Sequence, residues 1–240
     1  MKKFSQIPKP KAILFDNDGV LVSSEPLHLE AWQVLLPELG IPYDPADIHP
    51  FVGTTGPRVM AEILDKHRPG WKPEQFNLEA LALRKNDIYL EIVRTKLTQA
   101  PGVLDGLKWL RSLGVKTAVV TNAKRREMES SLQIVGLWDL LDEKISRDDA
   151  GRSKPDPTPY LMAAAALGFL PQECVAVEDS PSGLESALMS GAYGTAVTTT
   201  FSRSHLESPV PGRLDLKPVW IGASMVDFFA MLNQKVGATF

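Results

Sequence analysis

The sequence lacks the features that disulfide-rich, thiolate-metal and membrane-spanning proteins require. It contains a single cysteine, Cys174, among 240 residues, so neither an internal disulfide nor a cysteine metal cluster can form. The longest apolar stretch runs from Leu161 to Leu170 and is interrupted by Gly168. That stretch has about half the length that a transmembrane helix needs. We therefore expect no membrane partner.

An excess of positive charge is also missing. The formal net charge is −3, and acidic and basic residues are interspersed along the chain. No basic stripe marks a nucleic-acid surface, so we expect no DNA or RNA partner. The N-terminus carries Lys2 and Lys3 but then meets Pro8 and Pro10 instead of an apolar segment, which argues against a secretory signal. A cytoplasmic location is the resulting expectation.

The chain does contain enough apolar residues for a large core, since 44% of its residues are hydrophobic and 23% are charged. Its length suits one large domain, or one domain that carries a smaller insertion. After Pro101 and Gly102, segments of strand and helix character alternate, which indicates a parallel sheet covered by helices on both faces. Predicted strands cover 11–15, 115–120, 144–146, 174–179, 194–199 and 218–222, and predicted helices cover 104–113, 158–167, 182–191 and 225–232, with a further helix ending at 136.

A block of helical periods, from about Glu25 to Leu97, separates the first predicted strand from the rest. We interpret it as an insertion, because an unrelated separate domain would leave the first strand without its sheet. The predicted fold class is therefore α/β, with a Rossmann-like parallel sheet core and an inserted α-helical cap domain. The core domain would comprise residues 1–22 and 99–240, and the cap, residues 23–98, would lie over the C-terminal edge of the sheet.

Polar residues follow three of the predicted strands at the point where each strand ends. Ligands of open parallel sheets bind beyond the C-terminal ends of the strands, where the strand order reverses. One polar strand end would mean little, but three of them beside the root of an insertion describe a site. The three sets are Asp16 and Asp18, Thr121 and Asn122, and Glu178 and Asp179.

Four carboxylates close together require a counter-charge. The side chains of Asp16, Asp18, Glu178 and Asp179 would repel one another and raise each other's pKa from the usual ~4. A divalent cation relieves this repulsion, and hard oxygen ligands without cysteine or paired histidine suit Mg²⁺. The sequence therefore predicts a Mg²⁺ site formed by these four residues.

Donors for a phosphate group accompany the carboxylates. Thr121 and Asn122 offer a hydroxyl and an amide, and Lys154 in "RSKPDPTPY" offers an ammonium group. Together with the metal they would neutralise a phosphate as its charge is redistributed during transfer. Asp16 would be free to attack phosphorus. We therefore expect a small phosphorylated metabolite as the partner of this site.

These segments resemble the motifs of the haloacid dehalogenase superfamily of aspartyl-phosphate phosphotransferases. "FDNDGVL" is similar to the first motif, "VVTN" to the second, Lys154 to the third and "VEDSPSG" to the fourth. The likeness extends from about Lys11 to Thr200. The position of the helical insertion resembles the family's small cap type, as in the β-phosphoglucomutase and phosphoglycolate phosphatase-like subgroup.

The resemblance implies a role for each matching residue. Asp16 would be the nucleophile, and Asp18 would be the general acid and base and would also bind the metal through its backbone carbonyl. Dehalogenase members release a halide that needs no proton, whereas an alkoxide leaving group does need one, so Asp18 favours phosphoester chemistry. By the same resemblance, Thr121 and Lys154 bind phosphate. The remaining implied roles are metal ligation by Asp179 and support from Glu178.

Two positions depart from the family pattern. The third motif usually continues Lys-Pro-x-Pro-Asp, whereas this chain reads Lys154, Pro155, Asp156, Pro157 and Thr158. We expect Thr158 to cap the helix that follows. The middle residue of the first motif, Asn17, is more often apolar in relatives, and the sequence gives it no role.

The cap leaves two enzymatic functions open. His28 and Lys85, the latter in "RKND", resemble residues that take part in catalysis or closure in the β-phosphoglucomutase subgroup. A histidine packed under the cap and a lysine with an apolar stem along the helix are the structural alternatives. Against the mutase, Pro50 stands where that subgroup has an arginine, three residues before the cap-loop Gly53, and "VTN" is more similar to phosphatases. His28, Lys85 and Gly53 are therefore candidate substrate residues.

The predicted function is a monomeric, Mg²⁺-dependent phosphatase. Its substrate would be a small phosphomonoester, either a sugar phosphate or phosphoglycolate, and Asp16 would carry the aspartyl-phosphate intermediate. The first alternative is a β-phosphoglucomutase-like mutase. A second is a non-catalytic, phosphate-binding regulatory protein, but such a protein would be expected to have lost Asp16 or Asp18, and both are present.

Overall fold

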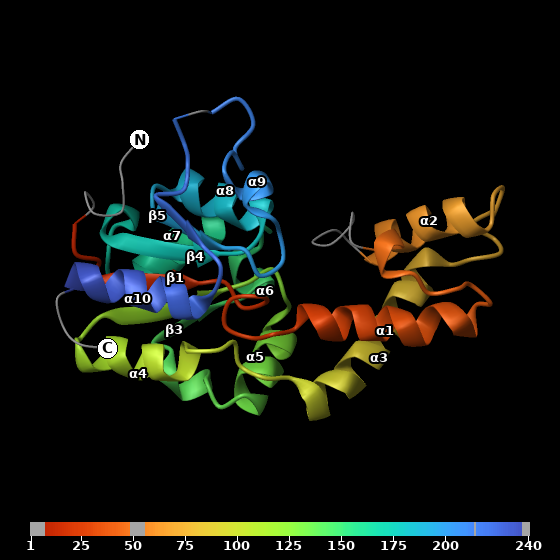
Figure 1. Cartoon of the computed structure of the whole chain (residues 1–240), viewed down its shortest axis with the longest axis horizontal. Coiled ribbons are helices and arrows are strands. Elements are labelled where there is room, and N and C mark those ends of the chain that lie inside the picture. The colour runs from red at the N-terminus through yellow and green to blue at the C-terminus, as the bar shows by residue number, and fades with distance from the viewer. Residues whose placement is uncertain (1–7, 49–55, 214, 237–240) are drawn as a thin grey trace. The chain divides into compact units, whose positions relative to one another are not determined.

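The computed structural model describes residues 8–48, 56–213 and 215–236, and the chain divides into two compact units (Figure 1). One unit comprises Met1–Ser23 and Thr98–Phe240, and the other comprises Ser24–Leu97. The chain therefore leaves the first unit after its first strand and returns to it some seventy residues later. We call the first the α/β unit and the second the helical unit.

The α/β unit contains a six-stranded sheet in the order β3-β2-β1-β4-β5-β6, in which every paired neighbour is parallel. The predicted fold class is confirmed. The order reverses between β1 and β4, because the chain builds one side of the sheet after β1 and the other side from β4 onward. The strands are β1 Ala12–Phe15, β2 Lys116–Val120, β3 Glu143–Ile145, β4 Cys174–Glu178, β5 Tyr193–Val197 and β6 Trp220–Gly222.

Helices connect and cover the strands of this unit. Helix α7 contacts β1 and β2, α8 contacts β4 and β5, and α4 contacts β2 and α10. The α-helices are α4 Val103–Ser112, α5 Arg125–Ile134, α6 Arg147–Ala150, α7 Thr158–Ala166, α8 Pro181–Ser190, α9 Arg203–Leu206 and α10 Met225–Val236. Two short 3₁₀ helices, η4 Trp138–Leu140 and η5 Pro171–Glu173, precede β3 and β4.

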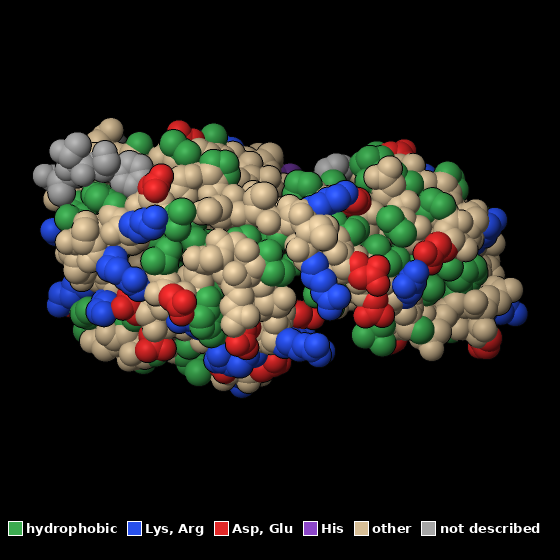
Figure 2. Space-filling model, turned by 90° about the horizontal axis from the view of Figure 1, so that it is seen from below, with side chains coloured by type: hydrophobic (Ala, Val, Ile, Leu, Met, Phe, Trp, Pro, Cys, Tyr) green, Lys and Arg blue, Asp and Glu red, His purple; other side chains and the backbone are tan. Residues whose placement is uncertain are grey.

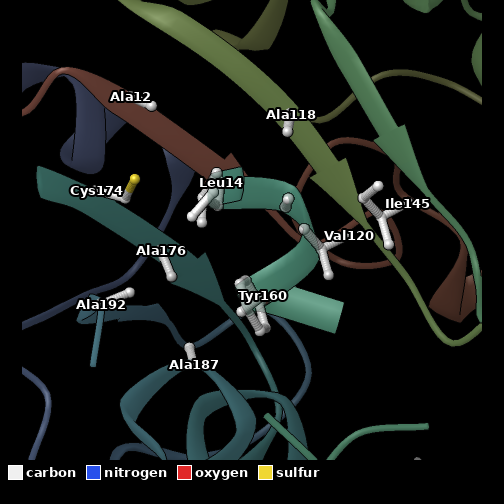
Figure 3. Close-up of a cluster of buried hydrophobic side chains, with 12 residues drawn as sticks. Ala12, Leu14, Ala118, Val120, Ile145, Tyr160, Cys174, Ala176, Ala187 and Ala192 are labelled. Atoms are coloured by element: carbon white, nitrogen blue, oxygen red, sulfur yellow. The ribbon is translucent and has the colours of Figure 1, made fainter. Parts of the chain in front are cut away.

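The fully buried strand β1 packs against helices on both faces of the sheet. Because successive side chains of a strand point to opposite faces, Leu14 and Phe15 serve different cores. Leu14 lies in the cluster shown in Figure 3, with Tyr160 of α7 and Ala187 of α8. Phe15 lies on the other face, where its ring centroid is 6.3 Å from those of Phe228 and Phe229 in α10.

Small side chains dominate the first of these cores. Seven of its twelve buried members are alanines, which lets α7 and α8 lie close to the sheet (Figure 3). Tyr160 is the largest side chain in this cluster and lies near the C-terminal ends of β1 and β4 (Figure 3). The packing on this face therefore places the hydroxyl group of Tyr160 near the end of the sheet.

The helical unit forms its own core. Its regular elements within the described residues are all helical: α1 Glu25–Glu38, the 3₁₀ helix η2 Pro45–Asp47, α2 Gly56–His67 and α3 Leu78–Lys96. Helix α3 packs against both α1 and α2. The buried side chains come from all three long helices and include Trp32, Leu35, Met60, Ile63 and Ile88. Pro50 and Gly53 lie outside the described residues.

The surface carries both signs of charge. On the face shown in Figure 2, Lys and Arg side chains alternate with Asp and Glu over both units. In the parts of the chain that the structure describes, no helix combines the length and apolar character of a bilayer-crossing segment.

Shortening Leu14 should destabilise the α/β unit. Leu14 is 0% exposed, so Leu14→Ala would leave a cavity and lower the free energy of unfolding by about 2–5 kcal/mol. Leu170→Ala is the matched control, because Leu170 is 65% exposed and should cost less than about 0.5 kcal/mol. Urea unfolding followed by circular dichroism measures both values. Equal losses for the two variants would contradict the assignment of Leu14 to the core.

Candidate active site

The polar residues singled out in the sequence lie at the C-terminal ends of three adjacent strands. Asp16 directly follows β1, Thr121 follows β2, and Glu178 is the last residue of β4. Backbone bonds hold these ends in register, since Asp16 N donates to Val177 O at 3.0 Å. Because β1 and β4 are the strands between which the order reverses, the site lies where open parallel sheets bind ligands.

Lys154 lies at the centre of this group. Its buried Nζ donates to Asp16 Oδ1 at 2.6 Å, to Glu178 Oε1 at 2.6 Å and to the carbonyl of Val120 at 2.8 Å. An ammonium group has three N–H donors, and all three are engaged. The side chain predicted to bind phosphate is therefore also the counter-ion of two buried carboxylates.

The backbone of Lys154 is held by Asn122. The Oδ1 atom of Asn122 accepts from Lys154 N at 2.8 Å, and its Nδ2 donates to Lys154 O at 3.4 Å. Thr121 Oγ1 accepts from Ala123 N at 3.0 Å. The structure thus brings Thr121, Asn122 and Lys154 together, with the Asn122 amide positioning the lysine loop.

Tyr160 belongs to the site but was not identified from the sequence. Its Oη donates to Glu178 Oε1 at 2.6 Å, and the Lys154 ammonium lies 5.2 Å from its ring centroid. Burial, followed by the charges of Glu178 and Asp16, raises the pKa of Tyr160 well above its ordinary value, so the phenol stays neutral and donates. A buried tyrosine usually finds a partner for its hydroxyl, but the apolar helix α7 gives no sign of which partner.

Two threonines after β5 were also missed. Thr200 Oγ1 donates a short hydrogen bond to Asp179 Oδ2. Thr199 Oγ1 donates to Gly19 O at 2.7 Å and lies 3.5 Å from Asp179 Oδ2. These residues obey the rule that found the other candidates, because they too follow a parallel strand. Applying that rule to β5 would have identified them.

Glycine at position 19 allows the first and fourth motifs to approach each other. Gly19 has a φ of +74°, and a Cβ placed on it would lie 1.8 Å from Asp179 Oδ2. A larger residue would therefore be strained and would also push the carboxylate away. Gly183 plays a similar role in α8, because a Cβ there would lie 2.1 Å from the carboxylate of Glu178.

Burial raises the pKa values of Asp16 and Asp179. Desolvation, followed by repulsion from Glu178, raises the pKa of Asp16 to about 8, although Lys154 opposes the shift. Desolvation, followed by the charges of Asp16 and Glu178, also raises the pKa of Asp179. Burial alone would lower the pKa of Lys154, but Asp16 and Glu178 outweigh it and hold that pKa above its ordinary value. The single positive charge of Lys154 therefore does not neutralise the carboxylates of this cluster.

The cluster fits a metal ion. Carboxylate oxygens of Asp16, Glu178 and Asp179 lie within 4.8 Å of one another. Three carboxylates and one ammonium group leave a net charge of about −2 when all are ionised, which a divalent cation would neutralise. The side chain of Asp18, the fourth residue expected at the metal, is not among the three that converge. Its Oδ2 instead accepts from Asn17 Nδ2 at 3.2 Å.

The candidate residues of the helical unit form a cluster of their own. Lys85 Nζ lies 2.6 Å from His28 Nδ1, and the His28 ring stacks on Tyr89 with centroids 3.9 Å apart. Burial, followed by the Lys85 charge, lowers the pKa of His28 well below its ordinary value. His28 is therefore neutral and accepts from Lys85 at Nδ1. Gly53, the third candidate of this unit, lies outside the described residues.

The expected helix cap at Thr158 is wrong. Thr158 is the first residue of α7, and its N-cap is Pro157, which makes no side-chain cap hydrogen bond. Asp156 lies just before that proline, and its Oδ1 accepts from Thr158 N at 2.9 Å and from Thr158 Oγ1 at 2.5 Å. Proline has no side-chain acceptor, so the aspartate before it bonds to the first N–H of the helix instead. Thr158 thus donates to an acceptor at the start of α7 and does not act as one itself.

Comparison with known proteins finds a matching family and relatives that are named as phosphatases. A family model described as haloacid dehalogenase-like hydrolase matches residues 10–191. Validoxylamine A 7'-phosphate phosphatase of Streptomyces hygroscopicus subsp. limoneus is 33% identical over 190 residues, which cover 79% of this chain and 86% of that protein. Phosphorylated carbohydrates phosphatase of Thermotoga maritima is 29% identical over 205 residues, which cover 82% of this chain and 91% of that protein.

Solved structures show the same likeness. The crystal structure of a HAD family hydrolase from Deinococcus radiodurans R1, with bound phosphate and sodium, matches with a TM-score of 0.74 and 30% identity. The match covers 95% of this chain and 97% of that chain. The similarity therefore extends over both units of the fold.

Replacing Asp16 should change how stability depends on pH in the absence of metal. Between the ordinary carboxyl pKa and about 8, folded wild-type protein holds a proton on Asp16 that the unfolded chain has lost, so its free energy of unfolding falls as the pH rises. Asp16→Asn cannot titrate. In EDTA, its stability relative to wild type should therefore increase by more than about 1 kcal/mol from about pH 5 to about pH 8. Urea unfolding at both pH values measures this difference, and a pH-independent difference would contradict the assigned shift.

Proposed function

Because the chain belongs to the haloacid dehalogenase-like hydrolases, we propose that it is a Mg²⁺-dependent phosphatase whose nucleophile is Asp16. Its substrate is a small phosphomonoester, and its intermediate is an aspartyl phosphate. The observation that carries the proposal is the convergence of Asp16, Lys154, Glu178 and Asp179 at the reversal point of the sheet. A nucleophile, a cation and a metal-binding carboxylate set are the parts that phosphoryl transfer needs.

The metal proposal follows from the chemistry of the donors. Asp16, Glu178 and Asp179 offer only carboxylate oxygens, which suit a hard cation such as Mg²⁺. The backbone carbonyl of Asp18 is the proposed fourth protein ligand. When bound, the ion would neutralise carboxylate and phosphate charge. Lys154 adds a fixed positive charge on the side of Asp16 and Glu178.

The first chemical step requires an ionised Asp16. Its pKa of about 8 in the metal-free cluster means that positive charge must compensate the burial before the carboxylate can attack. The Asp16 oxygen then bonds to phosphorus as the bond from phosphorus to the ester oxygen breaks. Asp18 gives its proton to the departing oxygen, while Thr121, Asn122 and Lys154 are proposed to hold the phosphate oxygens.

The second step returns the enzyme to its starting state. Asp18, now ionised, takes a proton from a water molecule whose oxygen bonds to phosphorus. The bond between Asp16 and phosphorus breaks, and inorganic phosphate leaves. Asp18 is partly exposed, in contrast to the buried Asp16, which suits a group that exchanges protons with substrate and water.

The relatives support the substrate class. One is named for a phosphate ester of validoxylamine A and another for phosphorylated carbohydrates. Since this chain covers 86% and 91% of these proteins, we propose a phosphorylated sugar or sugar-like metabolite as its substrate. We further propose that the enzyme is monomeric and cytoplasmic and has no nucleic-acid or membrane partner.

Removal of the nucleophile should abolish activity. Asp16→Asn should hydrolyse p-nitrophenyl phosphate more than about 1,000-fold more slowly than wild type, because no covalent intermediate can form. The wild-type rate should be lost in EDTA and restored by Mg²⁺. Asp105→Asn is the matched control, because Asp105 is an exposed residue of α4 and the variant should keep the wild-type rate. A wild-type, Mg²⁺-dependent rate for Asp16→Asn would overturn the proposed function.

A phosphosugar mutase is the second candidate, and the contact between Lys85 and His28 favours it. The sequence links these two residues with the β-phosphoglucomutase subgroup, and the structure places them 2.6 Å apart. "VTN" at the end of β2 favours the phosphatase. The family's aspartyl phosphate chemistry is common to both functions.

Product analysis separates the two candidates. Incubation with β-glucose 1-phosphate and a trace of the 1,6-bisphosphate should release inorganic phosphate from a phosphatase. We expect this outcome, measured by phosphate release and by enzymatic assay of glucose 6-phosphate. Rapid formation of glucose 6-phosphate with little inorganic phosphate would establish the mutase instead. A screen of phosphorylated metabolites for phosphate release would then identify the preferred ester.

A further inference from the structure

The buried side chain of Asn17 stands between the two aspartates of the first motif and has an unusual set of contacts. It is 2% exposed. Its Nδ2 donates to Asp18 Oδ2 at 3.2 Å and to Ser131 Oγ of α5 at 3.4 Å. Ser131 Oγ in turn donates to the carbonyl of Met128 at 2.9 Å. A chain of hydrogen bonds therefore runs from the backbone of α5 to the Asp18 carboxylate.

The orientation of the Asn17 amide is fixed by its neighbours. An ionised carboxylate can accept hydrogen bonds but cannot donate them. The NH₂ group of Asn17, and not its carbonyl, must therefore face ionised Asp18. One N–H then points to Asp18 and the other to Ser131. The backbone of Asn17 is held as well, since its carbonyl accepts from Leu21 N at 2.8 Å and Val22 N at 3.0 Å. The amide thus has a rigid base.

The same amide has a cost. Asn17 Oδ1 is buried and accepts no hydrogen bond from the residues that the structure describes. An unpaired buried carbonyl destabilises the folded state, and an apolar residue of similar shape would avoid that penalty. Stability alone would therefore favour leucine at this position. The contact with Asp18 gives a reason for asparagine that folding does not.

We infer that Asn17 is a positioning residue that holds the Asp18 carboxylate in one orientation for proton transfer. This inference rests on the proposed function, in which Asp18 protonates the leaving oxygen and then deprotonates water. A partly exposed aspartate has several accessible rotamers, and a hydrogen bond from a rigid amide selects one of them. Asn17 contacts neither reacting atom, so it acts through Asp18.

The test uses p-nitrophenyl phosphate, whose leaving group needs little protonation. With Asn17→Leu, formation of the aspartyl phosphate should proceed normally, whereas its hydrolysis should slow because Asp18 is misplaced. We expect kcat to fall about 10- to 100-fold and KM to fall in step, so that kcat/KM changes less than about threefold. Stopped-flow measurement should show a burst of about one nitrophenolate per enzyme. A general structural defect would lower kcat/KM and give no burst.

A double-mutant cycle shows whether Asn17 acts through Asp18. Asp18→Asn should lower kcat further than Asn17→Leu, and adding Asn17→Leu to Asp18→Asn should cause no further loss. Ser131→Ala should give a weaker form of the Asn17→Leu result, because one anchor of the amide is lost. Thr117→Val is the control for loss of a buried polar group, since Thr117 lies at the opposite end of β2. It should keep the wild-type kcat.

The outcomes separate the inference from the proposed function. A wild-type kcat for Asn17→Leu, or an equal loss from this change in the wild-type and Asp18→Asn backgrounds, would overturn the positioning role alone. A wild-type kcat for Asp18→Asn would overturn the role of Asp18 on which the inference rests. Circular dichroism of each variant confirms that the proteins compared are folded.

Discussion

The buried ammonium group of Lys154 is the interaction on which the other contacts of the site depend. It bonds to Asp16 after β1, to the carbonyl of Val120 at the end of β2 and to Glu178 at the end of β4. These are three adjacent strands, so one side chain ties together the edge at which the sheet order reverses. Removing one partner of a buried ion pair commonly costs about 3–5 kcal/mol, because the other partner is left uncompensated. The position of Lys154 is therefore strongly constrained, and Asn122 constrains it from the backbone side.

The sheet and the centre of the site could be predicted because both follow from simple periodic rules. Alternating strand and helix patterns specify parallel strands, and parallel strands bring their C-terminal ends to one edge. Asp16, Thr121 and Glu178 were therefore expected at one edge of the sheet once the strands were identified, and the observed order β2-β1-β4 makes them neighbours. Lys154 could not be identified from the strand ends, because it lies in a loop. Only its likeness to the family motif distinguished it from the other lysines. In the structure this lysine differs from the others because it is buried between two carboxylates, those of Asp16 and Glu178.

Other members of the site could not be predicted, because their roles depend on tertiary contacts. Tyr160 lies in a run of apolar residues, and nothing local shows that its hydroxyl reaches Glu178. The cap of α7 was assigned to Thr158 from local preference, whereas in the structure Thr158 is already helical and donates to Asp156. Asn17 gave no signal, since its partners are the next residue and a serine more than a hundred positions later. Spacing rules identify residues at strand ends and are silent about side chains that reach them from helices.

Two aspartates at the end of one strand have the same chemistry until their surroundings separate them. Asp16 is buried beside Glu178 and Lys154, and its pKa of about 8 shows that the metal-free site does not readily hold its charge. As the proposed nucleophile, Asp16 would depend on added positive charge in this environment. Asp18 is partly exposed and has an amide partner in place of a cation. This setting suits the proton transfer proposed for Asp18. The fold therefore gives the two carboxylates that follow the first strand different environments. Asn17, which lies between them, contributes to that difference.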